Sequence, residues 1–356
     1  MADIDWAKSM QQTFEYYKVD PVTWRDKERV YSITSSSISI DSENETLGSA
    51  SFDTTEALDE CYLRTYLICV QNGETFKFPL GTHLVQTPGK KFNGRIEEYS
   101  LDAYTPLLEL KDTRPPFGYS VLSGVKILES VSNITSYVVR APVVSASSDD
   151  TLTGDFVSDY ENDTWLTFLS DMLGSIDYEF NVDELGRIMF APYQDPNSMT
   201  PVWTFTDDDG SILYPEISVD RDLYSLPNVV EVMYSSSSGY LFSRVVNDDD
   251  NSPVSIPSRG REIVHRVINP EDIVDPVQEQ LDDYARNLLV SLSSLEYTLD
   301  YKHGYCPVRV GDCVLIDYKR SGFSGIKAVV KSQKIDCTTG CSVSEKATFT
   351  KRLWGW

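Results

Sequence analysis

The residues best suited to chemistry in this sequence are two runs of three aspartates. They are Asp207-Asp208-Asp209, followed by Gly210, and Asp248-Asp249-Asp250. A protonated and an ionised carboxyl group together could serve as the acid and base of a glycoside hydrolase. Carboxylate oxygens also suit Ca²⁺, but an EF-hand loop with Gly210 at its sixth position would begin at Phe205, which offers no ligand. Such runs are more typical of solvated turns, and we expect that role for both.

No other motif for catalysis or cofactor binding is present. The sequence has no nucleophile elbow, phosphate-binding loop, dinucleotide fingerprint or HExxH helix. It has no CxxC pair, and His83, His265 and His303 do not have the spacing of a zinc site. We therefore predict no catalytic, cofactor-binding or metal-ligating residues, and a protein that is not an enzyme.

Charge excludes a nucleic-acid reader. Asp and Glu number 55 against 31 Lys and Arg, a formal charge of −24. Proteins that bind nucleic acid concentrate positive charge because they neutralise phosphates, so this chain should repel a DNA backbone. The surplus has two interpretations that are compatible: it keeps the protein soluble, or it forms a surface that DNA passes without adhering.

Composition indicates a folded protein made inside the cell. The chain has 356 residues, 41% of them apolar, which suffices for two or three domains. No apolar run approaches the roughly 20 residues that span a bilayer, and the acidic N-terminus is unlike a secretory signal. Six cysteines do not make a disulfide scaffold. Cys337 and Cys341 flank a predicted hairpin tip, and we expect free thiols that could oxidise outside the cell.

The first part of the chain has a predicted helix followed by strands. Apolar residues at helical spacing predict a helix over residues 4–17. Residues 30–110 are typical of an antiparallel barrel or sandwich, with an Asn72-Gly73 hairpin between strands 63–70 and 75–78. Turns are expected at Pro88-Gly89 and Asn93-Gly94. A helix is predicted over residues 119–133.

The second part begins after a polar linker at residues 145–151. A helix over residues 165–173, capped by Asn162 or Asp163, precedes a hairpin of strands 178–182 and 187–191. Strands 229–234 and 240–246 flank a Ser-rich turn. A long amphipathic helix, capped by Asp275, is predicted over residues 276–292, and strands follow it. We expect Trp354-Gly355-Trp356 to pack against another surface.

Several segments, in order, resemble the central hub proteins of bacteriophage tails and related injection machines. They are Leu47–Phe52, Phe78–Val85, Gly94–Tyr99, Tyr104–Leu110, Trp165–Gly174, Tyr178–Asn181, Gly186–Phe190, Leu226–Val232, Ser252-Pro253, Arg259-Gly260 and Pro307–Val314 with the long helix before it. Their order and their coverage, from about residue 30 to 350, carry the resemblance.

The resemblance implies a β-rich α+β fold. It would contain two antiparallel tube-type β-barrel domains with packed helices, and a small helix-hairpin insert domain. The implied divisions are a helical arm at 1–28, a first barrel at 29–146 with helix 119–133, the insert at 152–205, and a second barrel at 206–356 with helix 276–292.

The resemblance also implies a function in assembly. Such a hub is a homotrimer whose pseudo-sixfold ring joins the tail tube or distal tail ring to tip, needle or fibre proteins, and it can meet the C-terminus of the tape measure protein. DNA passes its acidic channel without specific binding, and no cofactor is implied. We expect a place in the virion tail after synthesis in the host bacterial cytoplasm. Because the chain ends just after its last predicted strand, separate proteins should contact the host or digest its wall.

Two alternatives remain at this point. One is a tail-associated carbohydrate-binding or receptor-binding β protein, which would need an exposed aromatic platform. The other is a polysaccharide hydrolase that uses Asp207–Asp209. Sugar binding favours the first, loss of activity on changing these aspartates favours the second, and persistent inactive trimers favour the hub.

Overall fold

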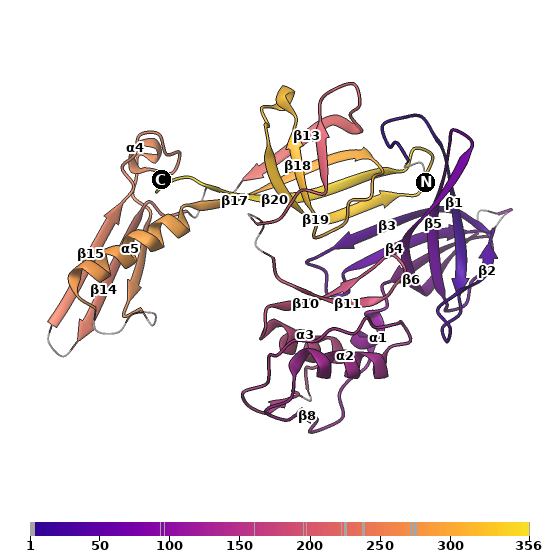
Figure 1. The fold of residues 1–356 in the computed structure, drawn as a ribbon, viewed down its shortest axis with the longest axis horizontal. Coiled ribbons are helices and arrows are strands. Elements are labelled where there is room, and N and C mark those ends of the chain that lie inside the picture. Colours follow the sequence, from indigo (N-terminus) through magenta and orange to yellow (C-terminus); the bar gives the residue numbers. More distant parts are fainter. Residues whose placement is uncertain are drawn as a thin grey trace. The chain divides into compact units, whose positions relative to one another are not determined.

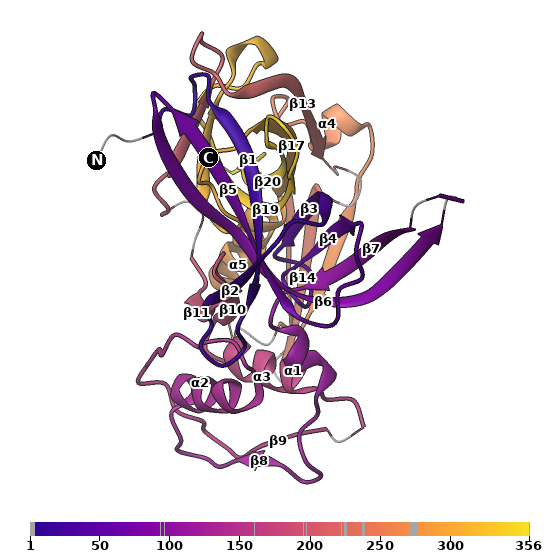
Figure 2. The ribbon, with the colours of Figure 1, turned by 90° about the vertical axis from the view of Figure 1, so that its right-hand side faces the viewer.

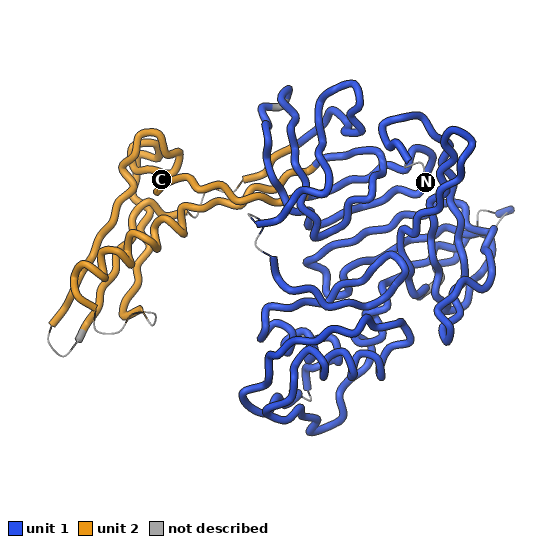
Figure 3. Tube along the Cα trace, viewed as in Figure 1, with its two compact units in different colours: residues 1–217, 301–346 blue, residues 218–300, 347–356 orange. Residues whose placement is uncertain are grey.

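The computed structural model describes residues 4–92, 94–95, 97–159, 161–194, 196, 198–221, 223, 226–236, 239–270, 273 and 276–355. The chain forms two compact units (Figure 3). Unit 1 contains residues 1–217 and 301–346, and unit 2 contains residues 218–300 and 347–356. Three strands begin in one unit and end in the other: β13 (Leu213–Arg221), β17 (Ser294–Gly304) and β20 (Ser342–Arg352).

Most of unit 1 is one large β-sheet (Figure 1). Its other strands are β1 (Gln11–Val19), β2 (Asp26–Val30), β3 (Ile33–Asp41), β4 (Gly48–Thr54), β5 (Tyr62–Gln71), β6 (Glu74–Phe92), β7 (Glu97–Tyr104), β12 (Trp203–Thr206), β18 (Cys313–Asp317) and β19 (Ile326–Asp336). From β19 the order is β3-β4-β7-β6-β5-β1-β2, and β18 and β12 follow β19 on its other branch. A short 3₁₀ helix, η1 (Lys319–Ser321), follows β18.

The N-terminal helix predicted over residues 4–17 is wrong. Residues 11–19 form β1, which pairs antiparallel with β5 from Gln11↔Val70 to Val19↔Tyr62. The segment QQTFEYYKV is rich in aromatic and β-branched residues, which fit a half-buried pleated surface. Pairing with an apolar neighbouring strand therefore outweighs the helical spacing of its apolar residues.

Local turn chemistry predicted one hairpin correctly and one turn wrongly. Asn72 and Gly73 both have positive φ, 53° and 84°, as the tight turn between β5 and β6 requires. Pro88-Gly89, by contrast, lies inside β6. The register against β7 shifts between Gln86 and Pro88, and such a bulge accommodates a proline without a turn. Asn93 of the other expected turn lies outside the described residues.

The sheet of unit 1 encloses a hydrophobic core but does not close. Buried side chains from its strands form one cluster that includes Tyr16, Ile38, Phe52, Leu67, Leu101, Ile335 and Val343. Among the described strands, no sheet returns to its first strand. The chain is therefore β-rich, as predicted, while the expected pair of closed antiparallel barrels is not confirmed.

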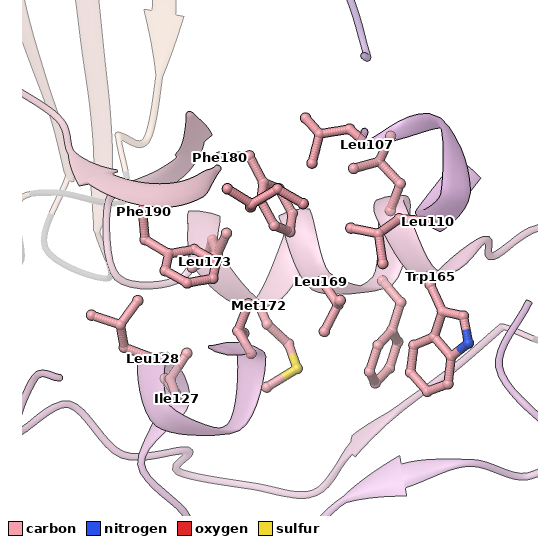
Figure 4. Packing of buried hydrophobic residues seen from close by; sticks show 14 of the residues in the cluster. Leu107, Leu110, Ile127, Leu128, Trp165, Leu169, Met172, Leu173, Phe180 and Phe190 are labelled. Carbon is pink, nitrogen blue, oxygen red and sulfur yellow. The ribbon is translucent and has the colours of Figure 1, made fainter. Parts of the chain in front are cut away.

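A small helical part of unit 1 has its own core. It contains α1 (Leu108–Asp112), α2 (Ile127–Val138), α3 (Trp165–Gly174), the β10–β11 hairpin (Tyr178–Val182 and Ile188–Pro192) and the short pair β8 (Ser120–Val121) and β9 (Phe156–Val157). Figure 4 shows side chains from all three helices and the hairpin meeting in one cluster. The predicted boundary near residues 146–152 therefore does not separate two cores.

Two helix starts differ from the prediction. Helix α2 begins at Ile127 and not at residue 119, because Ser120 and Val121 form β8 and Gly124 has a φ of 82°. Helix α3 is capped by Thr164, whose hydroxyl accepts a hydrogen bond from the backbone N–H of Thr167 at 3.2 Å. The predicted caps, Asn162 and Asp163, lie just before it.

Unit 2 consists of a three-stranded sheet and one long helix. The strands are β14 (Val229–Ser236), β15 (Gly239–Val246) and β16 (Val264–Ile268), and the helices are α4 (Ile256–Arg259) and α5 (Gln278–Leu292). Strand β15 is antiparallel to β14, whereas β16 is parallel to it. Leu281, Ala285 and Leu289 of α5 are fully buried against the sheet.

At the start of α5, a side chain accepts a hydrogen bond from a backbone N–H group that has no partner within the helix. Gln280 Oε1 accepts a hydrogen bond from the Val277 backbone N–H at 3.0 Å. The expected cap, Asp275, lies outside the described residues. Trp354 packs on the core under α5, as expected, while Trp356 is not described. No helix in the described part of the chain is long and apolar enough to cross a membrane.

Candidate functional site

The two aspartate runs lie in different units, and their side chains hold surface loops in place. In unit 1, Asp207 accepts a hydrogen bond from the Arg320 N–H at 3.2 Å, and Asp208 accepts one from the Gly210 N–H at 3.0 Å. In unit 2, Asp249 Oδ1 accepts bonds from the backbone and side-chain nitrogens of Asn251 at 2.9 and 3.2 Å. The bonds of Asp208 and Asp249 are short-range bonds within capped loops, whereas that of Asp207 joins its loop to η1. Among the described residues, no group of three or more acidic, His or Cys side chains is placed to hold a metal.

Unit 1 contains a buried polar cluster around Glu345 that the sequence did not reveal. Tyr301 donates to Glu345 Oε2 at 2.6 Å, Gln333 donates to Oε1 at 2.6 Å, and His303 Nε2 lies 3.2 Å from Oε1. His303 Nδ1 is 2.7 Å from the Gly304 carbonyl oxygen. All four side chains are almost fully buried. Burial, together with the Glu345 carboxylate, raises the pKa of Tyr301 well above its usual value.

This cluster is closed to a substrate. The ring of Phe205 lies 4.7 Å from the His303 ring and 5.4 Å from the Tyr301 ring, and Phe205 is itself 1% exposed. A buried carboxylate with several donors is costly to form but defines one arrangement of the strands that carry it. We therefore assign it a structural role. The only sequence signal is a polar residue at inward positions of strands that otherwise alternate apolar and polar.

A groove of about 480 Å³ opens on unit 1 beside this cluster. One wall is the segment Ile4–Ala7, and the other is formed by β12 and residues 210–212. The Trp6 ring is held by Phe78 and Tyr305, at centroid distances of 5.0 and 5.2 Å. Because Trp6 and Trp203 both line the groove, it offers aromatic surface to a ligand.

A two-stranded ribbon extends from the sheet of unit 1. Lys90–Phe92 of β6 pair only with β7, and the last two of these pairs lie beyond Tyr99, where the pairing of β7 with β4 ends. Figure 2 shows this ribbon projecting from the rest of the unit. Lys90 and Glu97 form an ion pair at 2.7 Å, and the Phe92 side chain is 62% exposed. Isolated ribbons are marginally stable in water, so this one is suited to pairing with another protein.

The helical part of unit 1 is fastened to the large sheet at the tip of the β10–β11 hairpin. The Leu185 carbonyl oxygen accepts bonds from Trp24 Nε1 at 2.7 Å and Arg64 Nη2 at 2.9 Å. Thr82 Oγ1 donates to the Glu184 carbonyl oxygen at 3.1 Å. Gly186, with a φ of 75°, lets this tip approach, because a Cβ there would lie 2.8 Å from the Thr82 Cβ.

Comparison with known proteins identifies the fold. No known protein-family profile and no curated protein sequence matches the chain. Among solved structures, a tail protein from Neisseria meningitidis MC58 is similar with a TM-score of 0.59 at 13% identity, over 95% of this chain and 97% of that one. The 43 kDa tail protein of prophage MuSo2 from Shewanella oneidensis gives 0.57 at 9% identity, over 94% and 98%.

A third structure, a Francisella PdpA-VgrG complex, gives a TM-score of 0.56 at 9% identity and covers 96% of this chain but 53% of that chain. At these identities the similarity establishes the fold. The chain has the fold of phage tail proteins. This confirms, at the level of the fold, the resemblance found in its sequence. None of the surfaces described above resembles a catalytic centre.

Proposed function

We propose that this protein is the structural hub of a phage tail tip or baseplate. Three copies form a pseudo-sixfold ring that joins the tail tube or distal tail ring to tip, needle or fibre proteins. The observation that carries the proposal is the similarity to two phage tail proteins. The match covers nearly all of this chain, 97% of the first tail protein and 98% of the second. The proposed location is the virion tail.

Assembly is the mechanism, without a chemical step. A sheet with open edges presents unpaired N–H and C=O groups that can pair with a strand of another subunit, and β2 lies at such an edge. The β6–β7 ribbon is a second surface of this kind. These features support contacts with a second copy and with ring proteins above and below it, including the tape measure C-terminus.

The net charge supports a channel for DNA. A basic wall would hold phosphates through many weak attractions, whereas a wall with surplus carboxylates lets DNA move. With a formal charge of −24, this chain fits the second type. DNA would then pass through the ring without specific binding.

Electron microscopy of the purified protein tests this function. We expect threefold rings in class averages at high protein concentration, alone or after addition of the tail-tube protein. Compact asymmetric particles under both conditions would contradict the hub. A ring that appears only with the tube protein would mean that the hub trimerises during tail assembly.

The groove between Trp6 and Trp203 favours one second candidate, a receptor-binding tail protein. Stacked aromatic side chains at a groove can hold the apolar face of a sugar ring. Glycan-array binding that is lost in Trp203→Ala, and kept in a variant of the exposed Tyr137 outside the groove, would support this function.

A further inference from the structure

In the buried cluster of unit 1, both oxygens of the Glu345 side chain accept hydrogen bonds. Tyr301 on β17 donates its hydroxyl hydrogen to Oε2 at 2.6 Å. Gln333 on β19 donates to Oε1 at 2.6 Å, and the same amide nitrogen donates to the Val308 carbonyl oxygen at 3.0 Å. The bond to Val308 fixes the orientation of the amide, because a carbonyl oxygen can only accept. Glu345 therefore accepts at both oxygens, as a carboxylate does.

The imidazole ring of His303 has a defined hydrogen at one nitrogen. Its Nδ1 lies 2.7 Å from the Gly304 carbonyl oxygen, which can only accept, so Nδ1 carries a hydrogen. The Cys306 sulfur is farther from the same nitrogen, at 3.8 Å. A neutral imidazole ring has a single N–H group. In a neutral His303, the other nitrogen, Nε2, would therefore have a lone pair.

The surroundings of Nε2 make a lone pair unfavourable. This nitrogen lies 3.2 Å from Glu345 Oε1, and both side chains are fully buried. Among the described residues, Nε2 has no hydrogen-bond partner. A neutral ring would place the lone pair of Nε2 beside a carboxylate oxygen, with no donor to compensate it. A proton on Nε2 replaces this repulsion with the attraction of an ion pair.

Charge balance leads to the same protonation state. A buried carboxylate needs a counter-charge, and in the described part of the chain no lysine or arginine pairs with Glu345. The other titratable groups described near the pair are Tyr301, Cys306 after β17 and Asp312 before β18. All three are acids, which supply no positive charge, and burial raises the pKa of each. The strands β12 and β19 place uncharged side chains on the cluster, Phe205 and Gln333.

We propose that His303 is an imidazolium ion at neutral pH and holds its second proton as the counter-ion of Glu345. Tyr301 and His303 lie on β17, Glu345 lies on the adjacent strand β20, and Gln333 lies on β19 beside it. The proton therefore stabilises the contact between three neighbouring strands. When it leaves, the carboxylate remains buried without a counter-charge, which destabilises the cluster. The pair is a pH-sensitive lock that is closed at neutral pH and loosened by alkali.

The direction of the pH effect depends on which state of the chain binds this proton. In an unfolded chain a histidine loses its second proton near pH 6.5, so above that pH the unfolded state has one proton fewer than the folded state. Folding then takes up a proton, and stability falls as the pH rises. His83 has the opposite effect, because burial lowers its pKa to about 4 and acid destabilises its neutral ring.

The first test is nitrogen-15 NMR of the full chain with labelled histidines. A neutral imidazole has one nitrogen with a hydrogen and one without, and their resonances lie far apart, whereas the two resonances of an imidazolium lie close together. The chain has three histidines, so His83→Leu and His265→Gln, the latter at an exposed position, assign the signals. We expect the imidazolium pattern for His303 at pH 7.5. A neutral pattern for His303 at this pH would overturn the inference.

The second test is urea unfolding as a function of pH. The double variant His303→Gln/Glu345→Gln removes both charges together, so it leaves no unpaired carboxylate in the cluster. We expect the unfolding equilibrium constant of the wild type, relative to this variant, to rise about tenfold from pH 7 to pH 8. Relative to the exposed control His265→Gln, we expect no such rise. A constant ratio between the wild type and the double variant would contradict the lock. NMR of the wild type decides the question even when the double variant does not fold.

Discussion

Acid should destabilise unit 1 through one buried histidine, His83. Its side chain lies on β6 beside β5, is 2% exposed, and packs against the Cα of Gly81, where a Cβ would clash with the ring. Among the described residues its Nδ1 has no hydrogen-bond partner. Burial therefore lowers the pKa of His83 from 6.5 to about 4.

The direction in which stability changes with pH depends on whether the folded or the unfolded chain binds the His83 proton more tightly. The unfolded chain protonates this histidine near its ordinary pKa, while the folded chain keeps it neutral until the pH reaches about 4. Stability is therefore full above about pH 6.5 and falls as the pH drops from 6.5 to 4. The lowered pKa corresponds to a loss of about 1 kcal/mol at pH 5.5 and between about 2 and 3 kcal/mol at pH 4.5.

The measurement compares urea unfolding of the wild type and His83→Leu at several pH values. Carboxylates elsewhere also titrate in this range, but they contribute equally to both proteins, so the difference isolates His83. The volume change at residue 83 adds an offset that does not depend on pH. We expect the stability of the wild type, relative to the variant, to fall with acid by the amounts above. A difference that is constant from pH 7.5 to 4.5 would refute the buried neutral histidine.

Three further predictions concern packing. Leu281→Asp should destabilise unit 2 by about 4 kcal/mol or more, because it buries a charge under α5. Leu288→Asp should cost only about 1–2 kcal/mol, because Leu288 is half-buried. Thermal or urea unfolding measures the difference between the two variants. Gly186→Ala should cost about 1–3 kcal/mol, since its φ is positive and its Cβ would meet Thr82, and the readout is faster hydrogen exchange in the β10–β11 hairpin. In native protein only Cys61, the one half-buried cysteine, should react with a thiol reagent, and the other five should react after unfolding.

Sequence reasoning predicted several local elements and the β-rich character of the fold, but the expected pair of closed barrels is not confirmed. Strand β5, the start of β6, helix α3, the β10–β11 hairpin, the β14–β15 hairpin and helix α5 lie close to their predicted positions, because turn residues and apolar spacing act over a few neighbours. The resemblance to phage tail hubs rested on the order of short segments. Similarity to solved phage tail proteins confirms this resemblance at the level of the fold.

Prediction failed where distant strands decide the outcome. Residues 4–17 have helical spacing, but pairing of β1 with β5, more than 40 residues later in the chain, makes a strand. The linker at 145–151 is polar, yet α2 before it and α3 after it share one core. In both cases the burial of apolar surface against a distant segment exceeds the small differences in local propensity.

Some properties of the candidate surfaces follow from the sequence, and others depend on the tertiary structure. The amino-acid sequence by itself determined the acidic charge, the lack of a catalytic motif, and the turns and helices whose signals are local. Only the tertiary structure decided that Glu345, His303, Tyr301 and Gln333 meet in one buried cluster. It also decided that the apolar side chains of β14, β15 and β16 form two faces, of which α5 covers one. The physical reason is that strand register, set by packing and backbone pairing between distant segments, determines which side chains are neighbours.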